Sequence, residues 1–186
     1  MKIHKQTTQH NGKAPFLPAF IGTSFGAGYW PWGPGTAGAL VGLLIWLGMA
    51  QFLSPLMLQA CTMLLSVVFY YAGVWAADRL EPCWGEDPSR VVVDEMVGTW
   101  IALLAAPAGH VWYGIAAFVL FRFFDMFKPF GVRHMERMGH GTGVMMDDVL
   151  AGMYAFFVLY LFRQVFYPLL LPLCLAIACG GLDMSN

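Results

Sequence analysis

The stretch LMLQACTMLLSVVFYYAGVWAA, residues 56–77, decides the fold class of this chain. Its 22 residues carry no charged side chain. At a rise of about 1.5 Å per residue, a helix of this length spans about 33 Å, which is enough for the ~30 Å hydrocarbon core of a bilayer. The stretch therefore predicts a helix that crosses a membrane.

The rest of the chain shares this apolar character. Of its 186 residues, 59% are hydrophobic and 11% are charged, and the mean hydropathy is +0.63; soluble proteins carry about 25% charged residues. No charge falls within 14–77 or 96–121, and only Arg163 falls within 149–182. We therefore expect an all-α, polytopic helical membrane protein.

Turn-forming residues divide the apolar part into about four to five helices. The glycine- and proline-rich segment 22–38 cannot continue a helix, and Thr36 is the expected N-cap of the helix that follows it. The expected helices are 37–52, 56–77, 91–106, 111–124 and 149–162, with a last apolar stretch at 165–179. We expect a polar N-terminal tail at 1–15, one helical domain at 16–182 and a short C-terminal tail at 183–186.

The polar loops 78–90 and 125–148 are expected on one face of the membrane, provided that the chain between them turns back near Pro107. Helices 91–106 and 111–124 are short for a crossing, so they either pack inside the bundle or insert only in part. Lys and Arg residues gather on the face of the loops, and the positive-inside bias places that face in the cytoplasm.

The charge and cysteine content exclude several classes of protein. A net charge of −1 and a pI of about 6.5 leave no basic tract, which argues against nucleic acid as a partner. The four cysteines show neither a disulfide framework nor a zinc-type pair spacing.

Three acidic clusters stand out among apolar neighbours: Asp94-Glu95, Asp125 and Asp147-Asp148. Asp94 and Asp147 could each be a helix cap, since carboxylates are favoured at helix N-termini. Five carboxylates from three segments on one face instead favour a hard divalent cation such as Mg²⁺, which prefers oxygen ligands and accepts substrate phosphate.

Basic and glycine-rich segments interleave with these acids. Arg122, Asp125 and Lys128 follow helical spacing, as do Arg133 and Arg137, so the cations either pair with the acids or clamp a phosphate. The segments 33–36 and 139–143 are each expected before a helix N-terminus, where free backbone N–H groups can bind an oxyanion.

Other phosphatase chemistries lack their signatures. Cys83 and Arg90 are separated by six residues rather than the five of the cysteine-phosphatase loop, and no Asp-x-Asp nucleophile motif occurs. The Asp-Gly-x-x-Ala-Arg string of the CDP-alcohol phosphotransferases is also missing.

The polar motifs as a set resemble those of the phosphatidylglycerophosphatase A family. The resemblance rests on FGAG at 25–28, PGTAG at 34–38, DPS at 87–89, VDEMVG at 93–98, FR at 121–122, DMFKP at 125–129 and GTGVMMDDVLAG at 141–152. It implies a Mg²⁺-dependent, multi-pass enzyme of the bacterial inner membrane, with its active site facing the cytoplasm. Such an enzyme hydrolyses phosphatidylglycerophosphate to phosphatidylglycerol and phosphate.

Residue roles follow from the acids, the cations and this resemblance. We expect Mg²⁺ to be held by Glu95, Asp125, Asp147 and Asp148. The expected catalytic residues are Asp94, Arg122, Lys128 and Asp148, and the expected substrate-binding residues are Gly26, Gly35, Thr36 and Arg133. The expected partners are the phospholipid substrate and membrane lipids; the sequence leaves the oligomeric state open. Two rivals remain, a CDP-alcohol-type phosphatidyl transferase and a non-enzymatic membrane subunit that carries cations.

Overall fold

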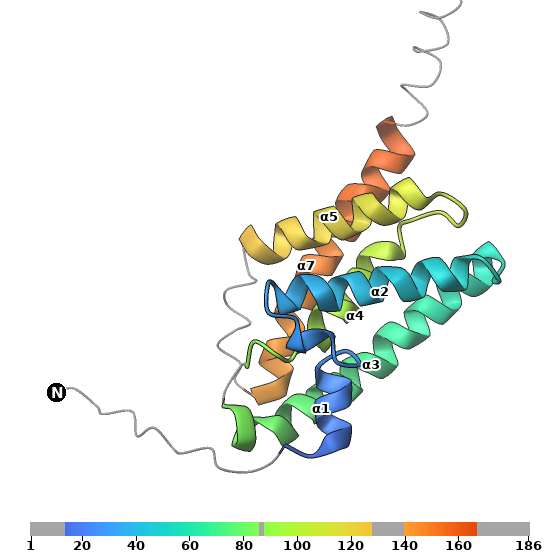
Figure 1. Ribbon diagram of the computed structural model, residues 1–186. Helices are drawn as coiled ribbons and strands as arrows, with labels where there is room; N and C mark the ends of the chain where they lie inside the picture. The colour runs from blue at the N-terminus through green and yellow to red at the C-terminus, as the bar shows by residue number, and fades with distance from the viewer. Residues whose placement is uncertain (1–13, 86–87, 128–139, 167–186) are drawn as a thin grey trace, which may run out of the picture.

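The computed structural model describes residues 14–85, 88–127 and 140–166, and the described residues are helical with no strand (Figure 1). The elements are α1 (Phe16–Gly22), the 3₁₀ turn η1 (Ala27–Tyr29), α2 (Pro34–Ala50), α3 (Pro55–Trp84), α4 (Val93–Leu103), α5 (Val111–Phe127), α7 (His140–Leu161) and the π-helical turn η3 (Phe162–Phe166). The expectation of an all-α fold is confirmed. The expected Lys128 and Arg133, and most of the stretch 165–179, lie outside the described residues.

Helix α4 lies at the centre of the bundle and contacts α2, α3, α5 and α7 (Figure 1). Nine of its eleven residues are buried. A helix of this length reaches only about 17 Å, so it cannot cross a bilayer. Of the two options that the sequence leaves for this segment, packing inside the bundle is the one observed.

Two helical hairpins bring the polar ends of the helices together. The turn between α2 and α3 falls at residues 51–54, at the junction of the expected helices 37–52 and 56–77, with Pro55 at the first position of α3. The chain also reverses between α4 and α5 around Pro107, which confirms the predicted return. Gly109 adopts a φ of +82° there, a backbone conformation that favours glycine.

Three predicted boundaries are wrong. The N-cap position of α2 is Gly33 rather than Thr36, because the φ of +120° at Gly33 ends the preceding turn and Pro34 then starts the helix. Helix α3 continues through the expected polar loop as far as Trp84. Helix α7 begins at His140 rather than 149, so Gly141 and Gly143 lie inside the helix and not in a loop before it.

The outer surface of the bundle is strongly apolar. Helices α3 and α7 are long and apolar enough to cross a membrane, and only 28% and 33% of their most apolar windows are buried inside the protein. Core helices of soluble proteins are mostly buried, so these exposed apolar faces indicate a membrane-associated protein. The shorter α2 is apolar as well. The number of crossings and the cytoplasmic orientation stay predictions.

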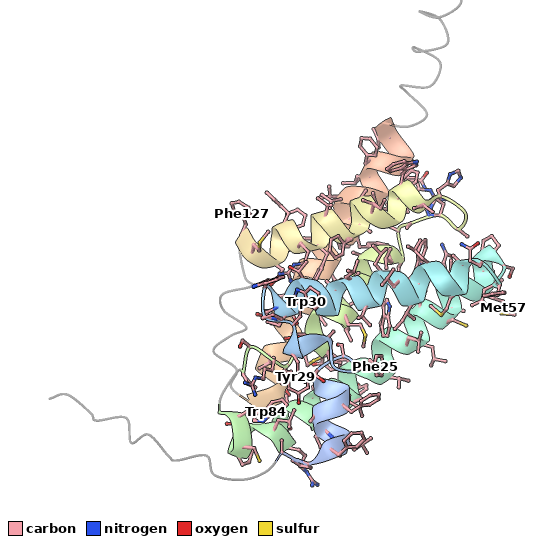
Figure 2. The ribbon with its side chains drawn as sticks, viewed as in Figure 1. Phe25, Tyr29, Trp30, Met57, Trp84 and Phe127 are labelled. Atoms are coloured by element: carbon pink, nitrogen blue, oxygen red, sulfur yellow. The ribbon has the colours of Figure 1, made fainter. Side chains whose placement is uncertain are left out.

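Aromatic side chains gather at the end of the bundle where α4 begins. Tyr29, Trp30 and Trp84 lie there, Phe25 lies nearer the middle of α3, and Met57 lies at the opposite end, beside the turn between α2 and α3 (Figure 2). The rings of Tyr29 and Trp84 meet edge to face, with centroids 6.5 Å apart. Aromatic residues of this kind are typical of the interface between bilayer and water.

Candidate active site

Three carboxylates from two helices converge near the aromatic end of the bundle. Asp94 and Glu95 lie in the first turn of α4, and Asp148 lies in α7. One oxygen of each lies within 4.8 Å of the other two. Asp94 is 8% exposed and Asp148 is 3% exposed, so the cluster is enclosed by protein.

The two acidic pairs share the same local geometry. The backbone N–H of Glu95 donates to Asp94 Oδ1 at 3.0 Å, and the backbone N–H of Asp148 donates to Asp147 Oδ1 at 3.0 Å. Each of these first aspartates thus uses one oxygen to hold the backbone of the residue that follows. The start of α4 is fixed further by Ser24, whose hydroxyl donates to the carbonyl of Val92 at 3.0 Å.

Helix α5 adds an ion pair to the cluster. Arg122 donates to Asp125 Oδ2 at 2.6 Å, and both side chains are about 15% exposed. The charge of Asp125 acts on both Glu95 and Asp148, so the α5 carboxylate belongs to the same electrostatic group. The convergence of α4 and α5 acids that the sequence predicts is therefore observed.

The N-terminus of α2 closes the cluster on a further side. A Cβ atom at Gly35 would overlap Glu95 Oε1 and would lie 3.4 Å from Arg122 Nη1. Only glycine leaves room for the Glu95 carboxylate at this position. The first N–H groups of a helix have no intrahelical acceptor, so the α2 terminus can present donors to an anion beside the acids.

The buried carboxylates of the cluster repel one another, and a bound cation would offset this repulsion. Burial raises the pKa of the Asp94 carboxyl well above its usual range, and the adjacent Glu95 adds to the effect. Burial also raises the pKa of Glu95, although Asp94 and Arg122 oppose the shift. Glu95 Oε2 is buried without a hydrogen-bond partner. An all-oxygen donor set with an orphaned carboxylate oxygen fits a hard divalent ion such as Mg²⁺.

The remaining predicted residues fall in different places. Gly26 has a φ of +100° in the turn before η1, where its N–H donates to Thr23 Oγ1 at 3.1 Å; this places it in the loop that packs on the start of α4. Thr36 is exposed in the first turn of α2. Asp147 precedes Asp148 on α7, and the charges of the two carboxylates interact.

Sequence reasoning missed two features that position the acids. Asp78, expected in a loop, lies in α3, and its Oδ1 accepts the backbone N–H of Gly141 at 2.8 Å, which caps the start of α7. The signal available was the lack of any helix breaker between Asp78 and Glu81. The second feature is the contact of Gly98 with Gly152, where α4 and α7 cross so closely that a Cβ on Gly152 would lie 2.5 Å from the Gly98 carbonyl oxygen.

Comparison with known proteins agrees with this geometry. The family model described as Phosphatidylglycerophosphatase A matches residues 20–163, which include every described acid of the cluster. A Bacteroides thetaiotaomicron protein named "Putative phosphatidylinositol-3-phosphatase" is 57% identical over 152 residues, 81% of this chain and 96% of the relative.

Two further relatives carry the name of the matching family. The phosphatidylglycerophosphatase A of Escherichia coli is 35% identical over 159 residues, 84% of this chain and 90% of the relative. That of Haemophilus influenzae is 34% identical over 142 residues, 75% of this chain and 85% of the relative. No solved structure shows a significant match to the chain.

Proposed function

The chain belongs to the phosphatidylglycerophosphatase A family, whose members are phosphoric monoester hydrolases, and from that premise we propose that it removes the terminal phosphate of phosphatidylglycerophosphate in a Mg²⁺-dependent reaction. The products are phosphatidylglycerol and inorganic phosphate. The observation that carries the proposal is the enclosed group of Asp94, Glu95 and Asp148 with its orphaned Glu95 Oε2.

Of the four expected ligands, Glu95 and Asp148 lie in the compact group, and Asp94 joins them there. We propose that these three hold Mg²⁺, and that the expected ligands Asp125 and Asp147, whose charges act on Asp148, complete or orient the set. Bound there, Mg²⁺ would supply a Lewis acid for the phosphate oxygens. Asp94 and Asp147 each accept a backbone N–H with one oxygen, and this hydrogen bond fixes the side-chain rotamer before any ligand binds.

The residues proposed to bind the phosphate approach from two helices. The first N–H groups of α2, at Gly35 and Thr36, face an anion at the helix terminus, and Arg122 supplies a positive charge beside them. We keep Lys128, Arg133 and Gly26 in the proposal as further phosphate contacts. As the P–O bond to glycerol breaks, the glycerol oxygen takes up a proton. Asp94 has one oxygen occupied by the Glu95 N–H, so it is proposed either to ligate Mg²⁺ or, instead of that role, to accept the proton of the attacking water.

Two routes for the attack differ in whether a protein carboxylate carries the phosphoryl group before water does. In direct hydrolysis, oxygen from water enters phosphate only. In a route through an aspartyl phosphate, hydrolysis of the intermediate leaves the protein carboxylate or the phosphate labelled, depending on which bond breaks. Because attack of water at phosphorus labels the phosphate in both routes, the two are separated by rapid acid quenching of a single turnover and mass spectrometry of the active-site peptides for a phosphoaspartate.

The first experiment measures phosphate release by the detergent-purified protein. Phosphatidylglycerophosphate should be hydrolysed in Mg²⁺ and not in EDTA. Asp148→Asn should abolish release, whereas Asp78→Asn should not, because asparagine keeps the oxygen that accepts the Gly141 N–H and Asp78 is not among the clustered acids. Absence of Mg²⁺-dependent release by the wild type would refute the proposal, and a phosphatidyl transferase would release no inorganic phosphate.

A second candidate substrate is phosphatidylinositol 3-phosphate, which the name of the 57% identical relative favours. Both lipids carry one phosphate monoester on the headgroup, so the proposed metal site would serve either of them. The ratio of kcat/KM for the two lipids, measured on the same preparation in mixed micelles, decides between them.

We also propose that the protein crosses the bacterial inner membrane several times, with the acidic cluster facing the cytoplasm. Ser54 and Ser89 are both exposed. Ser54 lies in the turn after α2, and Ser89 lies before α4, at the opposite end of the bundle. In a background without native cysteines, Ser89→Cys should be labelled from the cytoplasmic side and Ser54→Cys from the other. Labelling of both from one side would contradict this topology.

A further inference from the structure

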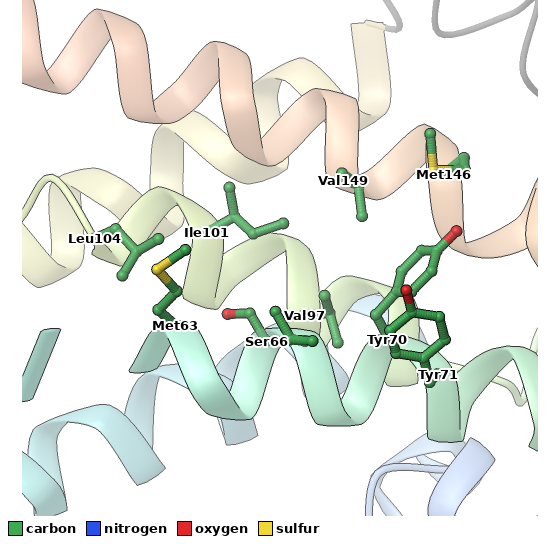
Figure 3. Close-up of a pocket in the computed structure, with 10 residues that line it drawn as sticks. Met63, Ser66, Tyr70, Tyr71, Val97, Ile101, Leu104, Met146 and Val149 are labelled. Atoms are coloured by element: carbon green, nitrogen blue, oxygen red, sulfur yellow. The ribbon is translucent and has the colours of Figure 1, made fainter. Parts of the chain in front are cut away.

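An apolar groove runs along α3, between that helix and helices α4 and α7 (Figure 3). Its volume is about 420 Å³, within the range of small-molecule sites. Tyr70, Tyr71 and Met146 lie at one end, and Met63 and Leu104 lie at the other (Figure 3). Tyr71 follows Met63 by eight positions, so the groove extends about 12 Å along α3.

The lining of the groove offers a ligand almost no polar partner. The Ser66 hydroxyl already donates to the Thr62 carbonyl at 2.8 Å, which leaves the two tyrosine hydroxyls as the exposed polar groups. The floor is buried, with Val97 1% and Ser66 7% exposed, whereas the rim at Met63 and Tyr71 is 61% and 68% exposed. The groove is therefore open along its side and closed beneath.

The tyrosine end of the groove adjoins the acidic cluster. Val97 follows Asp94 by three residues, about one turn of α4, and Val149 follows Asp148 directly on α7. The groove residues Val97 and Ile101 on α4 follow Asp94, so the groove continues along α4 from the level of the acids toward the opposite end of the bundle. None of the acids lines the groove itself, and the carboxylates lie next to its tyrosine end in the sequence of both helices.

We infer that this groove holds one acyl chain of the phospholipid whose phosphate reaches the acidic cluster; the inference rests on the function proposed above. Two walls of the groove, α3 and α7, are the two helices long enough to cross a membrane. A side opening between them faces the lipid phase, so a chain can enter without leaving an apolar medium. The tyrosine hydroxyls lie where the chain meets the polar part of the lipid.

The groove contributes orientation rather than hydrophobic binding energy, because the chain is as apolar in the bilayer as in the groove. A chain held along α3 fixes the direction from which the headgroup approaches the acids. Loss of the groove should therefore raise KM for a membrane-embedded substrate, while the acids themselves stay in place.

Neighbouring valines on α3 give a matched pair of variants. Val67 lines the groove and is 48% exposed, whereas Val68 is 50% exposed and is not part of the lining. With dioleoyl phosphatidylglycerophosphate in phosphatidylcholine nanodiscs, Val67→Trp should raise KM about tenfold by filling the groove, and Val68→Trp should change it less than twofold. Equal KM values for both variants, raised or unchanged, would overturn the inference.

Photocrosslinking tests the groove without any turnover. Phosphatidylglycerophosphate and phosphatidylcholine, each with a diazirine midway along one acyl chain, are compared in nanodiscs. The phosphate monoester probe should label groove peptides of α3 and α7 more strongly than the phosphatidylcholine probe, and Val67→Trp should remove this excess. Equal labelling by the two probes would show a general lipid contact and overturn the inference, whereas selective labelling without phosphate release would refute only the proposed reaction.

Discussion

Gly35→Ala is expected to lower the rate of phosphate release about a hundredfold while the fold stays intact. The added Cβ would overlap Glu95 Oε1, so the carboxylate must move away by roughly an ångström, and a misplacement of that size costs about 10² in rate. The overlapping atom is the end of a flexible side chain, so the backbone need not move. Alanine also favours the helix over glycine by about 0.5 to 1 kcal/mol.

A matched control separates this effect from the helix propensity. Gly48 lies in the same helix, and a Cβ there would meet nothing within 4 Å. Gly48→Ala should therefore stabilise the protein about as much as Gly35→Ala and leave activity unchanged. The assay is phosphate release in Mg²⁺ beside the thermal unfolding midpoint of each variant, followed by intrinsic tryptophan fluorescence.

A double variant tests whether the overlap itself is the cause. Glu95→Asp shortens the side chain by one methylene and should relieve the contact, so Gly35→Ala with Glu95→Asp should lose less activity than the two single effects combined. Gly35→Ala with wild-type activity, or Gly48→Ala with an equal loss, would refute the assignment of Glu95 to the metal site.

Three further variants probe the acids, the ion pair and the helix crossing. Asp94→Asn should lower kcat by several orders of magnitude yet raise the unfolding midpoint in EDTA at pH 8, because a buried carboxylate whose pKa is raised becomes a neutral amide; a lower midpoint would contradict this reading. Arg122→Met should lower kcat/KM about 10² to 10³, and titration with excess Mg²⁺ should not restore it, unlike a loss of metal affinity. Gly152→Ala should lower the unfolding midpoint in Mg²⁺ and in EDTA alike, because its Cβ would lie 2.5 Å from the Gly98 carbonyl oxygen; an unchanged midpoint would show that the crossing can widen freely.

The apolar stretches and their turns could be predicted from the sequence, whereas the ends of the helices could not. Charged residues at 78–81 are typical of a loop, but α3 continues there because Leu80 is completely buried against the bundle and Asp78 accepts the backbone N–H of Gly141. The glycines at 141 and 143 indicate a turn when only the sequence is considered. Gly141 serves close approach instead, since a Cβ there would lie 2.5 Å from the Val74 carbonyl oxygen.

The acids of the site could be singled out from the sequence, but neither the compact group among them nor the division of roles could. Apolar flanks single out five acids, Asp94, Glu95, Asp125, Asp147 and Asp148, since an ionised group in such surroundings needs a partner, whereas the compact group contains only Asp94, Glu95 and Asp148. Which oxygens remain available depends on backbone hydrogen bonds that spacing does not reveal, such as those that occupy Asp94 Oδ1 and Asp147 Oδ1. The proximity of Gly35 to Glu95 is equally invisible, because it joins residues sixty positions apart.

The separation of the acids is set by a contact one helical turn away from them. Gly98 follows Asp94 by four residues and Gly152 follows Asp148 by four, so each glycine shares a helix face with its acid. These glycines are where α4 and α7 touch backbone to backbone. The close crossing brings the two backbones together one turn from the acids, and oxygens from both helices lie within 4.8 Å of one another. The helix crossing and the acidic cluster are therefore coupled: Gly98 and Gly152, which carry no functional group, let α4 and α7 approach closely beside the acids that would share a cation.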